Sequence, residues 1–203
     1  MMKLRTLALC LLCLALLVAP AAAQYIYDNG PVNGTVDAWT INFGYTVSDT
    51  FTLNVASTPI GFVFWVWEFP GDKALTVDWS FTSEEFGGTT YASGTASVAD
   101  QFISANQYGY NIDKLTVTGL NIPLAAGTYW LNLQNATTQA GNPLYWDENS
   151  GPSAASESAL GTIPSEAFAI SGACCSQTPE PGSILLLGSG MLGLAALLRR
   201  RLT

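Results

Sequence analysis

Apolar residues occupy every second position in four segments of the central part of the chain, residues 39–45, 51–55, 75–81 and 129–133. Successive side chains of an extended strand point to opposite faces, so a period of two predicts a half-buried β-strand in each segment. The intervening positions are mostly threonine, serine, asparagine or aspartate, which suits a solvated face.

Residues 60–69 differ because they are apolar at almost every position. This pattern predicts a central strand that is covered on both faces. Pro70-Gly71-Asp72 follows directly and predicts a turn, since proline fixes one backbone dihedral and glycine permits unusual ones. Two shorter strands are predicted at 115–117 and 167–170.

Turn residues recur between these segments, and no segment between Gln24 and Gln177 has the 3.6-residue period of an amphipathic helix. The sequence therefore predicts an all-β domain. The number and spacing of the strands favour an antiparallel β-sandwich with jelly-roll-like connectivity.

The N-terminal segment has the order of a secretory signal peptide. Lys3 and Arg5 precede an apolar run from Leu7 to Val18, and a small-residue site ends at Ala23. We expect the Sec export machinery to translocate the chain and signal peptidase to cleave between Ala23 and Gln24. The alternative, an uncleaved signal anchor, requires a longer apolar span.

The C-terminal segment has the composition of a membrane span. Residues 184–198 are mostly apolar, and Arg199, Arg200 and Arg201 follow immediately. A helix from Pro181 to Leu198 would be about 27 Å long, against a hydrocarbon core of about 30 Å. We predict a transmembrane helix at about 182–198, with the arginines as a cytoplasmic stop that leaves the rest of the protein outside.

Pro179-Glu180-Pro181, the small-residue and leucine-rich apolar stretch and the arginine cluster occur in this order close to the C-terminus. In that order and spacing they resemble the PEP-CTERM protein-sorting domain, over about residues 178–201. The resemblance implies that an exosortase, an integral-membrane cysteine transpeptidase, recognises Pro179, Glu180 and Pro181 and removes the helix. The chain would then be a substrate of that enzyme. The alternative is a single-pass anchor on a proline-containing stalk.

These signals divide the chain into four parts. Residues 1–23 are the predicted signal peptide, 24–171 the β-sandwich passenger, 172–178 a linker and 179–203 the sorting tail. On this interpretation the protein is held transiently in the inner membrane and ends at the cell surface or in the extracellular matrix.

The passenger is strongly acidic. Between Gln24 and Gln177 the positive residues are Lys73 and Lys114, whereas every acidic residue of the chain except Glu180 lies there, which gives a net charge of −12. Such a surface repels nucleic acid and anionic lipid. Neutral glycans and calcium ions remain as partners.

The chain contains no histidine, which excludes Ser-His-Asp triads, Cys-His pairs and histidine-ligated metal sites. We therefore predict a passenger without enzymatic activity that binds or scaffolds exopolysaccharide. The alternative is a secreted glycan hydrolase that uses paired carboxylates, for which Glu84-Glu85 and Asp147-Glu148 are the tight acidic doublets. Solvated surface acids explain the same doublets.

One aromatic doublet predicts a glycan site. Tyr145 and Trp146 would offer rings for stacking on a sugar, and Asp147 and Asn149 would accept bonds from its hydroxyls. Packing in the core is the other interpretation, and it is the one that we favour for these rings, Trp146 included.

Oxygen ligands for calcium are offered by Asp147 and Glu148 and, near the start of the passenger, by Asp28-Asn29-Gly30. Ordinary Asx turns explain the same residues.

Cys174 and Cys175 are the cysteines that remain after signal cleavage, because Cys10 and Cys13 lie in the signal peptide. Outside the cytoplasm they are expected to oxidise, either with each other or with another chain.

Overall fold

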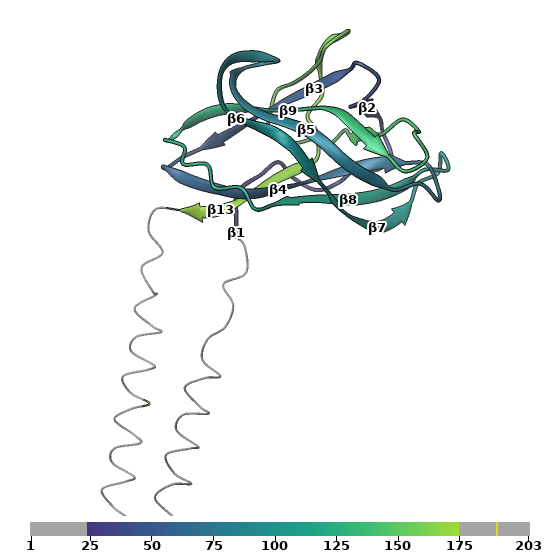
Figure 1. Cartoon of the computed structure of the whole chain (residues 1–203), viewed down its shortest axis with the longest axis horizontal. Helices are drawn as coiled ribbons and strands as arrows, with labels where there is room; N and C mark the ends of the chain where they lie inside the picture. The colour runs from purple at the N-terminus through teal and green to yellow at the C-terminus, as the bar shows by residue number, and fades with distance from the viewer. Residues whose placement is uncertain (1–23, 175–189, 191–203) are drawn as a thin grey trace, which may run out of the picture.

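The computed structural model of the protein describes residues 24–174 and residue 190 (Figure 1). The signal peptide, Cys175, the Pro-Glu-Pro segment, the arginine cluster and all but one residue of the predicted transmembrane helix lie outside the described residues. Within the described part of the chain, no helix has the length and apolar character needed to cross a membrane. The passenger is nearly all β-strand, and its strands pair antiparallel, so the predicted all-β class is confirmed.

The first sheet has seven strands, with β1, β13, β4, β10 and β2 in that order and with β8 and β7 on the other edge of β4. Their bounds are β1 Gln24–Asp28, β2 Ala38–Thr40, β4 Ser57–Glu68, β7 Ala99–Ala105, β8 Asn111–Thr118, β10 Tyr145–Asp147 and β13 Phe168–Cys174.

The second sheet has six strands in the order β12, β11, β3, β9, β5 and β6. Their bounds are β3 Thr46–Leu53, β5 Ala74–Glu84, β6 Gly87–Ser97, β9 Gly127–Thr138, β11 Ala155–Glu157 and β12 Gly161–Ile163. The two sheets form two layers (Figure 1). The arrangement is sandwich-like, and the jelly-roll connectivity stays a prediction.

Strand β4 is the centre of the first sheet, as its continuous apolar sequence predicts. It pairs with β8 along one edge, and β13 and β10 share the other. Phe62, Phe64 and Val66 alternate along β4 and are completely buried between the sheets. Trp65 and Trp67 have the opposite parity and therefore lie on the outer face of the first sheet.

The core between the layers is rich in aromatic side chains. Phe51 and Phe81 from the second sheet meet edge to face, with ring centroids 5.1 Å apart, and Phe62 from the first sheet contacts Trp79 at 5.9 Å. Each such pair adds about 1 kcal/mol to the stabilisation from area burial. The predicted strands at 51–55, 75–81 and 129–133 supply much of this core.

The predicted strand at 39–45 is wrong beyond Thr40. Strand β2 ends there, and the amide of Tyr45 donates to the carbonyl of Asn42 across a turn. Phe43 has a φ of 56° and Gly44 one of 88°, values that no extended strand adopts. Ile41 is completely buried whereas Phe43 and Tyr45 are exposed, so the apolar alternation in this segment marks a buried face only as far as Ile41.

The predicted elements leave out several strands and underestimate the length of β13. Strand β6 runs along the edge of the second sheet. After β6 the chain crosses to β7 of the first sheet at Val98, and the amide of Val98 donates to the carbonyl of Leu75. Strand β13 continues to Cys174, past residue 171 where the passenger is predicted to end and the linker to follow. The side chain of Cys174 and the whole of Cys175 are not described, so the predicted disulfide stays a prediction.

Candidate functional site

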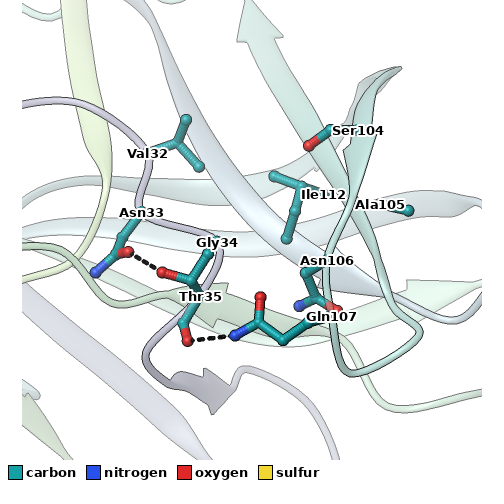
Figure 2. Close-up of a pocket in the computed structure, with 9 residues that line it drawn as sticks. All are labelled: Val32, Asn33, Gly34, Thr35, Ser104, Ala105, Asn106, Gln107 and Ile112. Carbon is teal, nitrogen blue, oxygen red and sulfur yellow. Dashed lines mark hydrogen bonds between the residues drawn. The ribbon is translucent and has the colours of Figure 1, made fainter.

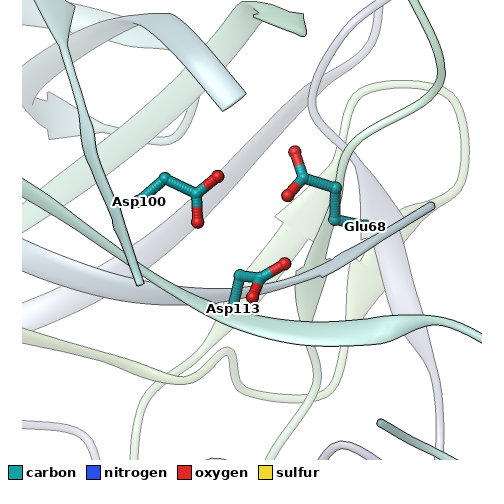
Figure 3. Close-up of side chains that lie close together, drawn as sticks. All are labelled: Glu68, Asp100 and Asp113. Atoms are coloured by element: carbon teal, nitrogen blue, oxygen red, sulfur yellow. The ribbon is translucent and has the colours of Figure 1, made fainter. Parts of the chain in front are cut away.

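Three carboxylates from three strands of the first sheet converge at one end of the sandwich. Glu68 ends β4, Asp113 lies near the start of β8, and Asp100 lies near the start of β7 (Figure 3). One oxygen from each lies within 4.8 Å of the others. We call Glu68, Asp100 and Asp113 the acidic cluster.

The pairing of the strands explains why these side chains meet. Asp113 pairs with Val66, and Asp100 pairs with Leu115, which itself pairs with Phe64. All three carboxylates therefore share the inner face of the sheet with buried apolar residues. The acidic cluster occupies positions that would otherwise extend the core.

Two members of the cluster are almost fully buried. Glu68 is 1% exposed and Asp113 is 2% exposed, whereas Asp100 is half-buried. Among the described residues, no group outside the cluster donates to either carboxylate oxygen of Glu68 or to Oδ1 of Asp113, and the cluster's own hydrogen-bonding contacts join Glu68 to Asp113 and Asp100. Burial, together with the neighbouring acids, raises the pKa of Glu68 to about 9, and burial also raises the pKa of Asp100 and Asp113.

The turn after β4 brings a fourth acid and one lysine near the cluster. The carboxylate of Asp72 is used within that turn and in a contact with the loop at 140–142. Its Oδ1 accepts from the amides of Lys73 and Ala140, and its Oδ2 accepts from Asn142 Nδ2. Burial raises its pKa, but these hydrogen bonds outweigh burial and lower it overall. The positive charge of Lys73 acts on Asp100 and Asp113.

The chemistry of the acidic cluster is that of a hard cation site. Carboxylate oxygens are the ligands preferred by calcium and magnesium, and the cluster offers no nitrogen or sulfur ligand. The sequence analysis missed it, because its members are far apart in sequence. One residue could have indicated the site from the sequence. Glu68 continues the alternation of Phe62, Phe64 and Val66, so an acidic side chain lies on the face of the predicted strand that is expected to be buried.

Asp147, predicted as a ligand for glycan or calcium, lies elsewhere and is buried. Its Oδ1 accepts from Trp67 Nε1 at 2.6 Å and from the amide of Gly34 at 2.7 Å, and its Oδ2 accepts from the amide of Asn33 at 2.8 Å. Burial raises its pKa, and these three donors act in the opposite direction. Asp147 therefore holds the 33–34 loop against β4.

Trp146 is completely buried, so the prediction of a stacking ring at this position is wrong. Its ring contacts Phe64 and Phe168 edge to face, and its Nε1 donates to the carbonyl of Ala167 at 3.0 Å. Tyr145, its neighbour on the opposite face, is half-buried and meets Tyr110 edge to face at 5.8 Å.

The other predicted ligands are also engaged within the protein. Asn149 donates from Nδ2 to the carbonyl of Asn29, and Glu148 accepts from Trp39 Nε1 at 3.3 Å. Asp28 accepts from the amide of Gly30 at 3.0 Å in an Asx turn. These contacts favour the structural alternatives for all three positions. Among the acids of the hydrolase alternative, Glu84 and Glu85 are exposed at the turn between β5 and β6.

A second buried polar region joins the two layers around Asn29. Its Nδ2 lies 2.6 Å from the carbonyl of Glu166, 2.7 Å from Ser165 Oγ and 3.3 Å from Asp49 Oδ2. Asp49 Oδ2 also accepts from the amide of Glu166 at 2.7 Å, while Asp49 Oδ1 and both carboxylate oxygens of Glu166 have no partner. Burial raises the pKa of Asp49 to about 7 and that of Glu166 well above its ordinary range.

A small hollow of about 140 Å³ opens on the outer side of the first sheet (Figure 2). The loop at 32–35 forms one wall, the segment 104–107 forms the other, and Ile112 lies between them. Gln107 Nε2 donates to the carbonyl of Thr35 at 3.1 Å and joins the two walls. Asp147 positions this hollow indirectly, because it holds the amides of Asn33 and Gly34.

Amide side chains give the hollow a polar lining. Asn106 Oδ1 accepts from the amides of Tyr108 and Tyr110, both at 3.0 Å, which fixes the orientation of the Asn106 side chain. Its Nδ2 is buried and has no partner. Beside the hollow, Tyr108 is 56% exposed and stacks on Trp67 with ring centroids 5.6 Å apart at 23°. The sequence pattern assigned no site to Tyr108.

Comparison with known proteins gives one informative result. A search of curated proteins finds no match. Among solved structures, the chain is similar to a CocE/NonD family hydrolase from Staphylococcus aureus, with 11% identity and a TM-score of 0.33. The match covers 75% of this chain and 37% of the hydrolase, so the chain spans well under half of that protein's length.

The family model described as the PEP-CTERM protein-sorting motif matches residues 177–201. The resemblance predicted for about residues 178–201 is thereby confirmed. The motif implies an exosortase as the processing partner, and it implies a protein that is exported, anchored in the membrane and then located at the surface. This chain carries a PEP-CTERM protein-sorting motif as its C-terminal segment.

Proposed function

We propose that the protein is an exosortase-sorted surface or matrix protein whose β-domain is a non-catalytic module that binds neutral stretches of exopolysaccharide. The sorting motif at residues 177–201 carries the first half of this proposal. The amide-lined hollow beside the exposed ring of Tyr108 supports the second half.

The lining of the hollow suits sugar hydroxyls. Asn106 Nδ2 is a donor without a partner, held in place because its Oδ1 is engaged by two amides. A buried donor without a partner costs about 1–3 kcal/mol. Because Nδ2 is closed to solvent, a sugar hydroxyl would remove that cost only with a movement of the 104–107 wall. Asn33 and Gln107 add further amide groups on the two walls.

The ring of Tyr108 suits the apolar face of a sugar. One face of this ring stacks on Trp67, and its hydroxyl donates to the carbonyl of Thr35 at 3.3 Å, so the ring is held in place. More than half of the side chain is still exposed. A fixed aromatic ring next to hydrogen-bonding groups is a common arrangement in small-ligand sites.

The charge of the passenger selects the class of glycan. A net charge of −12 between residues 24 and 177 disfavours acidic polysaccharides, nucleic acids and anionic lipids. Neutral hexose-containing segments carry no such penalty.

The hydrolase alternative requires two carboxylates that face one substrate. Glu84 and Glu85 point into solvent at a turn, and both oxygens of Asp147 are taken by protein donors. These placements support a binding role over a hydrolytic one. Alanine substitution of Glu84, Glu85, Asp147 and Glu148, one at a time, should leave glycan turnover at the background level of the wild type. Turnover that is abolished in a variant with the wild-type Tm would establish the alternative.

The sorting half is tested by expressing the tagged chain with and without a matching exosortase. We expect loss of mass at the C-terminus and transfer from the inner membrane to the surface or medium only with the enzyme. An unchanged mass and permanent residence in the inner membrane would contradict sorting.

The binding half is tested with the full chain in detergent on an array of neutral and acidic glycans. Tyr108→Ala should weaken binding by about two- to tenfold, the effect of losing one aromatic contact. Tyr91→Ala is the matched control, since Tyr91 is an exposed ring on β6 of the other sheet. Equal affinity of the wild type and Tyr108→Ala for every bound glycan would contradict this site.

A further inference from the structure

We infer that Glu68, Asp100 and Asp113 bind one calcium ion at the end of the sandwich, and that this ion stabilises the exported domain. The inference concerns stability, so it is independent of glycan binding. It places calcium at residues other than Asp147 and Glu148, which the sequence suggested.

The first observation is geometric. Three strands deliver one carboxylate each to the same point, with an oxygen of each within 4.8 Å of the others. Calcium lies about 2.3–2.6 Å from its oxygen ligands, so two ligands of one ion are at most about 5 Å apart. The separations within the acidic cluster meet that limit, and Figure 3 shows the three carboxyl groups turned toward one another.

The second observation is the state of Glu68. This side chain is 1% exposed, and no group outside the acidic cluster donates a hydrogen bond to either of its oxygens in the described part of the protein; its hydrogen-bonding contacts are with the carboxyl groups of Asp113 and Asp100. Its carboxylate points into the space shared with Asp100 and Asp113. A buried carboxylate without donors is costly, and a bound cation would compensate both of its oxygens.

The third observation is the shortage of positive charge. Between Gln24 and Gln177 the only basic residues are Lys73 and Lys114. The Lys114 ammonium lies 5.8 Å from the ring centroid of Trp65, on the outer face of the first sheet. Of the described basic residues, Lys73 is the one whose charge acts on the cluster, so a single lysine faces three acidic groups.

The donor set selects the ion. Zinc and copper sites use histidine or cysteine, and the acidic cluster contains oxygen ligands only. Magnesium keeps several waters and requires near-octahedral geometry, which a cluster with two almost fully buried members does not favour. Calcium accepts six to eight oxygens in flexible geometry, and the half-buried Asp100 leaves one side open to water. Extracellular modules bind calcium with Kd values of about 10⁻⁴–10⁻³ M, which suits an exported domain.

The test is a thermal unfolding series with the full chain in detergent, first stripped with a chelator and then titrated with calcium chloride or magnesium chloride. At a hundredfold excess over Kd, calcium should raise Tm by about 5–10 °C. Calorimetric titration should give one ion per chain. Absence of bound calcium, or an equal Tm rise with magnesium at the same concentration, would overturn the assignment.

Glu68→Gln and Asp113→Asn keep the side-chain shape and remove one negative charge each. Without calcium, both variants should melt at or above the wild-type Tm, because they relieve repulsion in the cluster. With calcium, the Tm rise should disappear. Glu85→Gln, a carboxylate exposed at the turn between β5 and β6, is the matched control and should keep the full rise. A rise that survives in Glu68→Gln would contradict the site.

Discussion

Trp67 donates its indole Nε1–H to Asp147 Oδ1 over 2.6 Å, which joins β4 to β10 on the outer face of the first sheet. The same carboxylate accepts the amides of Asn33 and Gly34. One buried acid therefore holds together the central strand, a short neighbouring strand and the loop that walls the hollow. It positions the candidate glycan site without lining it.

Replacing Asp147 by alanine should destabilise the domain, because three buried or half-buried N–H donors lose their acceptor. The expected cost is about 3 kcal/mol, which lowers Tm by about 6–12 °C. Glycan binding should weaken as well, since the 33–34 loop loses its anchor. Glu85→Gln provides the control at an exposed acid. A wild-type Tm in Asp147→Ala would contradict the anchoring role.

Gly34 shapes the hollow through its backbone. Its φ is +68°, and an added Cβ would lie 3.1 Å from Ile112 Cγ1. Gly34→Ala should therefore cost about 2 kcal/mol and weaken glycan binding. Gly44→Ala is the matched control, because Gly44 has a φ of +88° and no atom within 4 Å of an added Cβ. It should show the backbone strain alone, about 1 kcal/mol. Denaturant midpoints would measure the loss of stability in Gly34→Ala and in Gly44→Ala. Equal losses would show that Ile112 moves away from the added methyl group without cost.

Substitution of Trp146 distinguishes a ring that packs in the core from a ring that contacts a ligand. Trp146→Phe removes part of a completely buried side chain and its bond to the carbonyl of Ala167, so we expect a loss of about 2 kcal/mol. Glycan affinity should stay at the wild-type value, in contrast to Tyr108→Ala. A reduced glycan affinity together with an unchanged Tm would show instead that Trp146 contacts the glycan.

The sequence predicted the interior of this fold better than its edges. Long apolar alternation at 75–81 and continuous apolar sequence at 60–69 located β5 and β4, because burial imposes those patterns. Strand β6 has mostly small and polar residues that are exposed along the sheet edge, so no hydrophobic period marks it. In residues 39–45 the pattern misled, because Phe43 lies in a turn and is 64% exposed.

The candidate sites depended on contacts between distant residues. Asp147 is close in sequence to Tyr145 and Asn149, which suggested a shared ligand site, but its partners are Trp67 and the 33–34 loop. The acidic cluster likewise depends on the register of β4, β8 and β7. The spacing of residues along the sequence does not determine which residues of two distant strands lie opposite each other. The pairing of the strands in the structure determines it.

Asp49 predicts how stability changes with pH. Burial raises its pKa from 3.8 to about 7 in the folded state, so the folded protein holds the proton more tightly than the unfolded chain. Its contribution to stability is complete below about pH 3.8 and falls as pH rises through 7. The shift corresponds to a loss on the order of 4 kcal/mol.

Asp49→Asn removes this titration and should make the decline of unfolding free energy between pH 4 and 7 less steep by the share of one group, while Glu166 and the other buried acids continue to contribute to it. Urea unfolding at several pH values would measure it. Asp78→Asn, at a partly exposed acid of β5, is the control and should retain the wild-type slope. The same slope in Asp49→Asn and the wild type would show that Asp49 is ionised throughout this range.

Strand β13 lies between β1 and β4 and ends at Cys174, and the sorting motif begins at residue 177. The intervening residues span at most about 10 Å. The first sheet thus lacks an inner strand until almost the entire passenger has been synthesised. Completion of this sheet by its last strand, directly before the sorting motif, is the order of folding that β13 imposes.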